Sequence, residues 1–209
     1  MDKFIIYYDY SWPFVYNATV WLQEVKNIKN DQLIFEWRHF QLEEAKMEDS
    51  SIFEIESKDL SKTRSLLSAV CAESAKLQGQ NLFERFHYAV LNARNNMSPR
   101  FPLNDFNKFL DLAVDVGLDR NKFIDDFNNP QLIINVKKDH QEGVKKYGVF
   151  GTPTLVFDNE QAVFIKTFIP KDKDDYIIFF EYIVKIFRDM PFIGELKRPQ
   201  PPWPKGIKK

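Results

Sequence analysis

The chain has 209 residues, of which 44% are hydrophobic and 15% are aromatic, and its formal net charge is −1. This length allows one domain with a sizeable core and an inserted subdomain, and the balanced charge gives no reason to expect nucleic acid or an anionic membrane as a partner. A single cysteine, Cys71, excludes an intramolecular disulfide and a cysteine-rich zinc site.

The amino-terminal residues show no basic stretch followed by an apolar signal core. No apolar run reaches roughly 18 residues, the length that a membrane-spanning helix needs. We therefore expect a soluble, cytoplasmic protein. The three histidines, His39, His87 and His140, are far apart and lack the spacing of metal ligands, so no metal site is predicted.

The first part of the chain predicts a β-α-β unit. Residues 4–8 form a continuous apolar run, which is typical of a buried parallel strand. Residues 13 to about 28 predict an amphipathic helix, and residues 33–40 predict the second strand. The buried face of that helix is expected to contain Val15, Thr19, Leu22 and Val25. The crossover between the two strands should be right-handed.

The middle of the chain predicts helices without strands. Residues 47–60 are polar and weakly patterned, so we expect a loop there. Five helical segments follow between about Ser61 and Tyr147: one that ends at Gly79, one over 82–91, and three over 103–116, 121–127 and 131–147.

The last part returns to strands. Residues 154–157 and 162–166 predict two strands around a hairpin turn at 158–160, and residues 174–188 predict a closing helix. The tail over 191–209 contains four prolines from Pro199 onward, so we expect an extended arm. That arm either wraps the domain or docks to a partner through Trp203.

A short motif separates the last predicted helix of the middle part from the third strand. It reads Gly151-Thr152-Pro153-Thr154. A bond before proline adopts the cis form at low cost, and a proline fixed in a turn at the start of a strand is a candidate for it. Proline cannot donate to a strand ladder, so Pro153 should lie at the first residue of the strand or at an edge.

These residues resemble the DsbA-like family. Gly-Thr-Pro-Thr after a helix is similar to the cis-proline loop of the thioredoxin fold in that family. Residues 37–43 and the proline at the first helix resemble its isomerase branch, which includes 2-hydroxychromene-2-carboxylate isomerases and FrnE-type proteins and is related to kappa-class glutathione transferases. The resemblance implies an α/β thioredoxin fold with an all-helical insertion between the β-α-β and β-β-α halves.

The implied organisation has three parts. Residues 1–46 and 147–190 would form the thioredoxin-like domain, residues 47–146 the helical insertion, and residues 191–209 the proline-rich arm. In this fold the cis-proline loop faces the start of the first helix. We therefore expect a groove lined by Ser11, Trp12, Pro13, Thr152 and Pro153, and we call these five residues the cis-proline site.

The resemblance also implies what this chain has lost. DsbA-like proteins place Cys-Pro-x-Cys at the start of the first helix. Aligned on Pro13, Trp12 stands where the attacking cysteine should be, and Val15 stands where the resolving cysteine should be. Neither side chain can perform thiol chemistry, so dithiol-disulfide oxidoreductase activity by the usual route is not expected.

Each residue of the cis-proline site has a structural and a functional interpretation. Ser11 either caps the first helix or donates a hydrogen bond to a bound thiolate, as the resemblance to glutathione transferases implies. Trp12 either fills the space of the lost cysteine or forms a platform for an aromatic ligand. Thr152 and Pro153 either build a turn or, as in the family, pair the backbone of Thr152 with an extended peptide or glutathione.

Other polar residues are expected to have structural roles. Asp9 should cap the first helix or form a salt bridge, and Tyr10 and Tyr16 should pack beside it. Cys71, within Ala69-Val70-Cys71-Ala72, should be a small buried side chain without a redox role. His39 is the one histidine expected near the groove, as a structural hydrogen bonder.

Three functions remain open. The first is a DsbA-like protein of the oxidoreductase and isomerase family that has lost its redox cysteines. The second is a glutathione-dependent isomerase or transferase for an aromatic small molecule, with glutathione in the groove and Ser11 as the catalytic hydroxyl. The third is a non-catalytic module that binds an extended peptide. The partner would thus be a small-molecule thiol or a peptide, and a homodimer is left open.

Overall fold

The structure is a computed structural model, and it describes residues 2–47, 51–53 and 59–197. It contains a four-stranded sheet in the order β2-β1-β3-β4. Strand β1 (Asp2–Tyr8) is parallel to β2 (Leu33–His39) and antiparallel to β3 (Thr154–Val156), which pairs antiparallel with β4 (Ala162–Phe164). This mixed sheet with its helices confirms the predicted thioredoxin-like fold.

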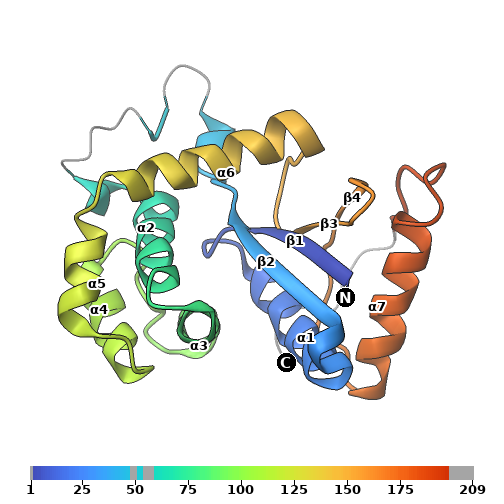
Figure 1. Cartoon of the computed structure of the whole chain (residues 1–209), viewed down its shortest axis with the longest axis horizontal. Coiled ribbons are helices and arrows are strands. Elements are labelled where there is room, and N and C mark those ends of the chain that lie inside the picture. The colour runs from blue at the N-terminus through green and yellow to red at the C-terminus, as the bar shows by residue number, and fades with distance from the viewer. Residues whose placement is uncertain (1, 48–50, 54–58, 198–209) are drawn as a thin grey trace.

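The helices follow the predicted order closely. Helix α1 (Pro13–Lys29) connects β1 to β2, and α7 (Asp174–Phe187) closes the described chain (Figure 1). Among the described residues, five α-helices lie between β2 and β3 in the chain: α2 (Arg64–Lys76), α3 (Gln80–Asn96), α4 (Phe106–Asp115), α5 (Arg120–Phe127) and α6 (Gln131–Tyr147). The predicted helical segments are therefore present, and most of their ends differ by only a few residues.

Strand β1 shows why the sheet is covered on both faces. Side chains along a strand alternate between its two faces. Phe4, Ile6 and Tyr8 belong to one large cluster with residues of α1 and α7. Tyr7 points to the opposite face, where it forms a smaller cluster with Phe40, Val149 and Val156. An apolar run without alternation is the pattern expected for a strand buried in this way.

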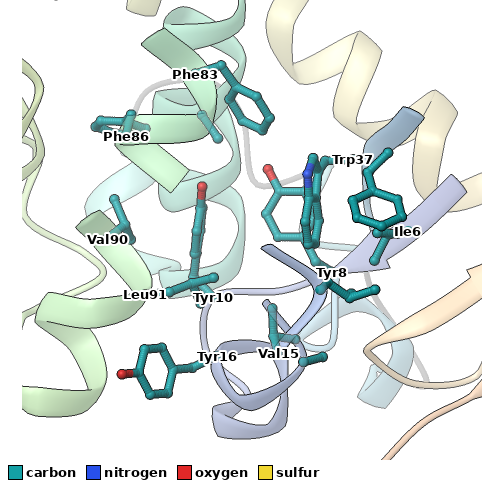
Figure 2. Close-up of a cluster of buried hydrophobic side chains, with 14 of the residues drawn as sticks. Ile6, Tyr8, Tyr10, Val15, Tyr16, Trp37, Phe83, Phe86, Val90 and Leu91 are labelled. Carbon is teal, nitrogen blue, oxygen red and sulfur yellow. The ribbon is translucent and has the colours of Figure 1, made fainter. Parts of the chain in front are cut away.

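The large cluster continues from the sheet into the helical insertion. Figure 2 shows side chains from the sheet and the β1–α1 loop meeting side chains from α3, namely Tyr8, Tyr10 and Trp37 with Phe83, Phe86, Val90 and Leu91. The same cluster extends to Phe109 of α4 and Phe123 of α5. Each such side chain contributes about 1.5–3 kcal/mol when it is fully buried. The apolar core thus fixes the insertion against β2 and α1.

One glycine allows α6 to lie directly on the sheet. A Cβ atom at Gly143 would be 2.8 Å from Cε1 of Tyr7, a distance at which the tyrosine ring would have to move. The helix then ends at Gly148, which adopts the left-handed conformation (φ 64°) that glycine tolerates best. Gly143 thus lets α6 pack closely on the sheet, and Gly148 ends the helix a few residues before Pro153.

Two expectations concern other parts of the chain. The arm beyond residue 197, which includes Trp203, lies outside the described residues. Within the part that the structure describes, no helix combines the length and the apolar character that crossing a membrane requires.

Candidate functional site

The start of α1 differs from the cap that the sequence predicts. Trp12, in an extended conformation, is the N-cap residue, and no side chain caps the helix. The backbone N–H of Trp12 donates to the carbonyl of Asp9 at 3.2 Å, and Pro13 is the first helical residue. The expectation that Ser11 caps the helix is therefore wrong, because Ser11 lies one residue too early and its N–H is bound to Asp9.

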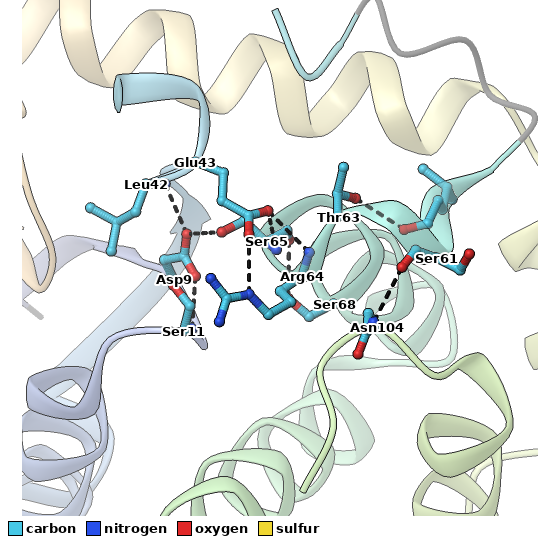
Figure 3. Close-up of polar contacts among 11 residues, drawn as sticks. Asp9, Ser11, Leu42, Glu43, Ser61, Thr63, Arg64, Ser65, Ser68 and Asn104 are labelled. Atoms are coloured by element: carbon cyan, nitrogen blue, oxygen red, sulfur yellow. Dashed lines mark hydrogen bonds and ion pairs between the residues drawn. The ribbon is translucent and has the colours of Figure 1, made fainter. Parts of the chain in front are cut away.

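Asp9 is a buried hydrogen-bond acceptor that joins three segments. Its carboxylate accepts from the backbone N–H of Ser11 and Leu42, both at 2.8 Å, and from the hydroxyl of Ser65 at 2.6 Å (Figure 3). Glu43 accepts from the N–H of Ser65 at the start of α2. Among the described residues, Asp9 thus neither caps α1 nor forms a salt bridge. It ties the β1–α1 loop to the end of β2 and to the insertion.

Trp12 is a half-buried aromatic wall at the start of α1. Its ring centroid lies 5.7 Å from that of Phe14. The Nζ atom of Lys166 lies 5.9 Å from the Trp12 centroid and 4.8 Å from the Phe14 centroid, within the range of cation–π contacts. The tryptophan therefore packs on its neighbours while part of its surface stays exposed.

Three other residues that the sequence analysis considered, Val15, Cys71 and Tyr10, are closed to solvent. Val15 and Cys71 are fully buried, and burial raises the pKa of the Cys71 thiol well above its ordinary value. Tyr10 is buried too, and its hydroxyl lies 3.0 Å from Nδ1 of His87. Burial raises the pKa of Tyr10, so it stays protonated. These residues pack as the sequence predicts, and Cys71 is an inert core side chain.

The loop before β3 has an unusual backbone. The Thr152–Pro153 peptide bond is cis, the conformation expected for it. The carbonyl of Pro153 accepts from the N–H of Ile165 at 2.9 Å, and the hydroxyl of Thr154 donates to the carbonyl of Gly151 at 2.8 Å. Thr152 is buried, yet its Oγ1 has no hydrogen-bond partner among the described residues. Its backbone lies outside the strand pairing of β3.

The segment after β4 connects this loop with the start of α1. Ile165 binds Pro153 on one side, and the next residue, Lys166, contacts Trp12 on the other. Farther along, the carbonyl of Thr167 accepts from the side-chain amide of Asn17 in α1 at 2.8 Å. The segment 165–167 therefore lies between the two halves of the cis-proline site.

A charged cluster that the sequence analysis missed lies where β2 meets α2 and α6. Nε2 of His39 is 3.0 Å from Oε1 of Glu73, and the backbone N–H of His39 donates to Asp139 at 3.1 Å. Lys76 binds Glu73 at 2.7 Å and donates to the carbonyl of Trp37 at 2.9 Å. His39 is a structural hydrogen bonder, as expected, but its ring points to α2.

Burial and neighbouring positive charges act in opposite directions on the pKa values of the carboxylates in this cluster. Burial alone would raise the pKa of Glu73, but its hydrogen bond with His39 and the charge of Lys76 lower that pKa well below its ordinary value. Burial raises the pKa of Asp139. One ligand-type atom each from His39, Glu73 and Asp139 lies within 4.8 Å of the others. Lys76 already supplies a positive charge there. A glutamate, Glu73, on the buried face of α2 is the one sequence signal that could have indicated a buried charge here, although it does not identify the partners.

The chain was compared with known proteins. The profile of the DSBA-like thioredoxin domain family matches residues 3–169. A search of curated proteins finds no match. A solved probable DsbA oxidoreductase from Streptomyces coelicolor is 15% identical, with 99% of this chain and 98% of that chain covered and a TM-score of 0.63.

Two further solved structures are similar in fold. A putative protein disulfide isomerase from Nitrosomonas europaea is 12% identical, with coverage of 88% and 98% and a TM-score of 0.62. The cytosolic disulfide reductase DsbM from Pseudomonas aeruginosa, solved with GSH, is 14% identical, with coverage of 88% and 99% and a TM-score of 0.62.

Proposed function

This chain belongs to the DSBA-like thioredoxin domain family, and we propose that it uses the cis-proline site to bind an extended backbone, without dithiol chemistry of its own. The observation that carries this proposal is Thr152. It is buried beside a cis proline, it lies outside the strand pairing, and its Oγ1 has no partner in the described part of the chain. A bound extended chain would supply the missing partners.

The side chains at the start of α1 argue against disulfide exchange. That reaction needs a thiolate that attacks a disulfide sulfur and a second thiol that resolves the product. Trp12 and Val15 carry no sulfur, and Cys71 is buried in α2. A protein that binds without exchanging disulfides needs no oxidising compartment, which agrees with the cytoplasmic location that we propose.

A glutathione-dependent isomerase or transferase of the isomerase branch is the second candidate. The observation that favours it is the pair of aromatic rings of Trp12 and Phe14, which directly follow Ser11 in the chain. Such a pair suits an aromatic substrate. A structural neighbour of this chain, DsbM, was solved with GSH. In this function Ser11 would donate to the glutathione thiolate.

Three ligands test the binding proposal. We would follow the amide resonance of Thr152 during titration with S-methylglutathione, which carries no thiol, and with tri-alanine of similar length. Equal shifts with both ligands support a general site for extended chains. A response to S-methylglutathione alone supports the second candidate. No shift of Thr152 with either ligand or with a longer extended peptide contradicts the proposal.

Two activity assays separate the remaining functions. We expect no reduction of insulin disulfides, because the site has no thiol. Insulin reduction that survives Cys71→Ala would contradict the proposal. Conjugation of glutathione to 1-chloro-2,4-dinitrobenzene would support the transferase function, provided that Ser11→Ala lowers its rate by about a hundredfold, the effect of removing a hydrogen-bond donor that stabilises charge.

A further inference from the structure

A cavity along the outer edge of β2 lies away from the cis-proline site. It has a volume of about 590 Å³ and is lined by residues of β2, the end of α1 and the start of α3, among them Lys26, Phe35 and Glu84. Figure 1 shows these three elements side by side. Volumes of 300–1,000 Å³ are typical of sites for small molecules. We call this space the outer cavity.

A smaller chamber adjoins the outer cavity. It has a volume of about 40 Å³, and it shares Lys26, Phe35 and Glu84 with the outer cavity. Nζ of Lys26 lies 2.5 Å from Oε1 of Glu84, so this ion pair stands where the two spaces meet. We call the smaller space the inner chamber. Because the two spaces share these lining residues, they adjoin each other, and we take them together as one passage.

His87 lies at the inner end of this passage. It is only 2% exposed and lines the inner chamber. Its Nδ1 is 3.0 Å from the Tyr10 hydroxyl, while its Nε2 has no partner among the described residues. Burial holds the pKa of His87 well below its ordinary value, so the ring is neutral. An unpartnered buried nitrogen is costly to the fold, and a ligand atom that binds it removes this cost.

The other lining groups define the ligand. Phe35, Trp37 and Tyr88 supply aromatic surface. The hydroxyl of Thr19 donates to the carbonyl of Val15, and Lys26 and Glu84 neutralise each other. The ligand should therefore be uncharged and largely apolar. A hydroxyl both donates and accepts, so it satisfies Nε2 in either tautomer of His87. The inner chamber has room for a group about the size of a water molecule.

We propose that the inner chamber and the outer cavity together bind a small neutral molecule that carries a hydroxyl group. The hydroxyl occupies the inner chamber and hydrogen-bonds Nε2 of His87. The apolar body lies against Phe35 and Trp37 and extends into the outer cavity, past the ion pair of Lys26 and Glu84. None of the five residues of the cis-proline site lines either space, so this site is independent of the proposed function.

The test uses p-cresol as the probe and toluene as the matched ligand without a hydroxyl. The full chain is titrated with each while the imidazole ¹⁵N resonances of His87 are recorded. We expect p-cresol to move the Nε2 resonance and to bind at least threefold more tightly than toluene, although toluene is the more apolar of the two. A hydrogen bond to a neutral group accounts for a difference of about three- to tenfold.

Two variants complete the test. His87→Phe keeps an aromatic ring and should weaken p-cresol binding about three- to tenfold while leaving toluene binding unchanged. The control is His140→Phe, which alters a buried histidine of α6 outside both spaces and should leave both affinities unchanged.

The proposal is overturned if p-cresol leaves the His87 resonances unmoved up to its solubility limit, or if toluene binds as tightly as p-cresol. Both readouts come from the unaltered chain, so they decide the matter even if His87→Phe does not fold.

Discussion

Two regions of this molecule contrast in the side chains from which they are built. The cis-proline site is built around a cis Thr152–Pro153 bond and the start of α1, where Trp12 and Val15 carry neither a thiol nor an ionisable group. The cluster of His39, Glu73, Lys76 and Asp139, where β2 meets the insertion, concentrates the buried ionisable side chains. The comparison teaches that the fold pairs its buried charges in one region, while in the other it leaves Oγ1 of Thr152 without a partner among the described residues. This difference is why we propose the cis-proline site as the binding site.

The largest expected effect concerns thiol reactivity. Trp12→Cys places a thiol at the N-terminus of α1, where the helix dipole lowers the pKa of a cysteine. We expect it to react with a disulfide reagent at least a hundredfold faster than the buried Cys71 of the unaltered chain. With Val15 unable to resolve it, a mixed disulfide with glutathione should persist.

Ser11→Cys is the matched control, because it places a thiol one residue before the N-cap. If Trp12→Cys reacted no faster than Cys71, the start of α1 would not activate a thiol. The contrast between this site and the buried core would then be contradicted.

The next effect concerns the charged cluster. Glu73→Gln removes the carboxylate that binds both His39 and Lys76. Because it leaves Lys76 without its compensating charge, we expect a loss of about 3 kcal/mol in the free energy of unfolding, as for a broken buried pair. Urea denaturation measures it.

Glu181→Gln is the matched control, since Glu181 forms an exposed ion pair with Lys29 whose loss should cost less than about 1 kcal/mol. Equal losses of unfolding free energy in the two variants would show that the buried cluster contributes no more to stability than an exposed ion pair.

The third effect concerns pH. The pKa of His87 in the folded protein lies well below that of the unfolded chain because of burial. The unfolded chain therefore takes up a proton first as the pH falls. The stabilising contribution is complete above pH ~6.5 and is lost below it, at about 1.4 kcal/mol per pH unit. We expect a loss of about 2 kcal/mol from His87 between pH 6.5 and 5.

Urea denaturation at pH 7, 6 and 5 measures this loss, and His87→Phe should reduce it. A part remains from His140, whose pKa burial also lowers. An unfolding free energy that changed equally with pH in both proteins would contradict the assignment.

The smallest effect concerns Thr152. Thr152→Val replaces a hydroxyl that has no partner among the described residues by a methyl group of similar size. We expect a gain of up to about 1 kcal/mol in the free energy of unfolding, since an unsatisfied polar atom is removed. Thermal denaturation measures it, with Thr154→Val as the control. Thr154 donates to Gly151, so its replacement should destabilise instead. A loss in Thr152→Val would reveal a partner for the hydroxyl.

The elements of the fold were predictable, because hydrophobic periodicity is a local property of the chain. The residues of α1 that recur at helical spacing, such as Val15 and Leu22, are indeed buried. That Ser11 does not cap the helix was not predictable. A cap preference is worth only about 1 kcal/mol, and here the bonds that Asp9 makes with Ser11, Leu42 and Ser65 decide the path of the loop.

The charged cluster was not predictable for a different reason. His39 and Asp139 are 100 residues apart in the chain, and only the packing of α6 against β2 brings them together. The same holds for Tyr10 and His87, which are 77 residues apart. Family resemblance pointed to Trp12 and Pro153 because their motifs are short and local, whereas these contacts depend on the tertiary fold.

The most direct test of the central claim is a calorimetric titration with reduced glutathione. We predict binding in the micromolar to millimolar range, about −8 to −4 kcal/mol, which Pro153→Ala weakens at least tenfold. Pro99→Ala, at the exposed cis proline between α3 and α4, should leave it unchanged. Equal binding in all three proteins, or no heat either with glutathione or with the longer extended peptide, would contradict the claim that the cis-proline site binds a backbone.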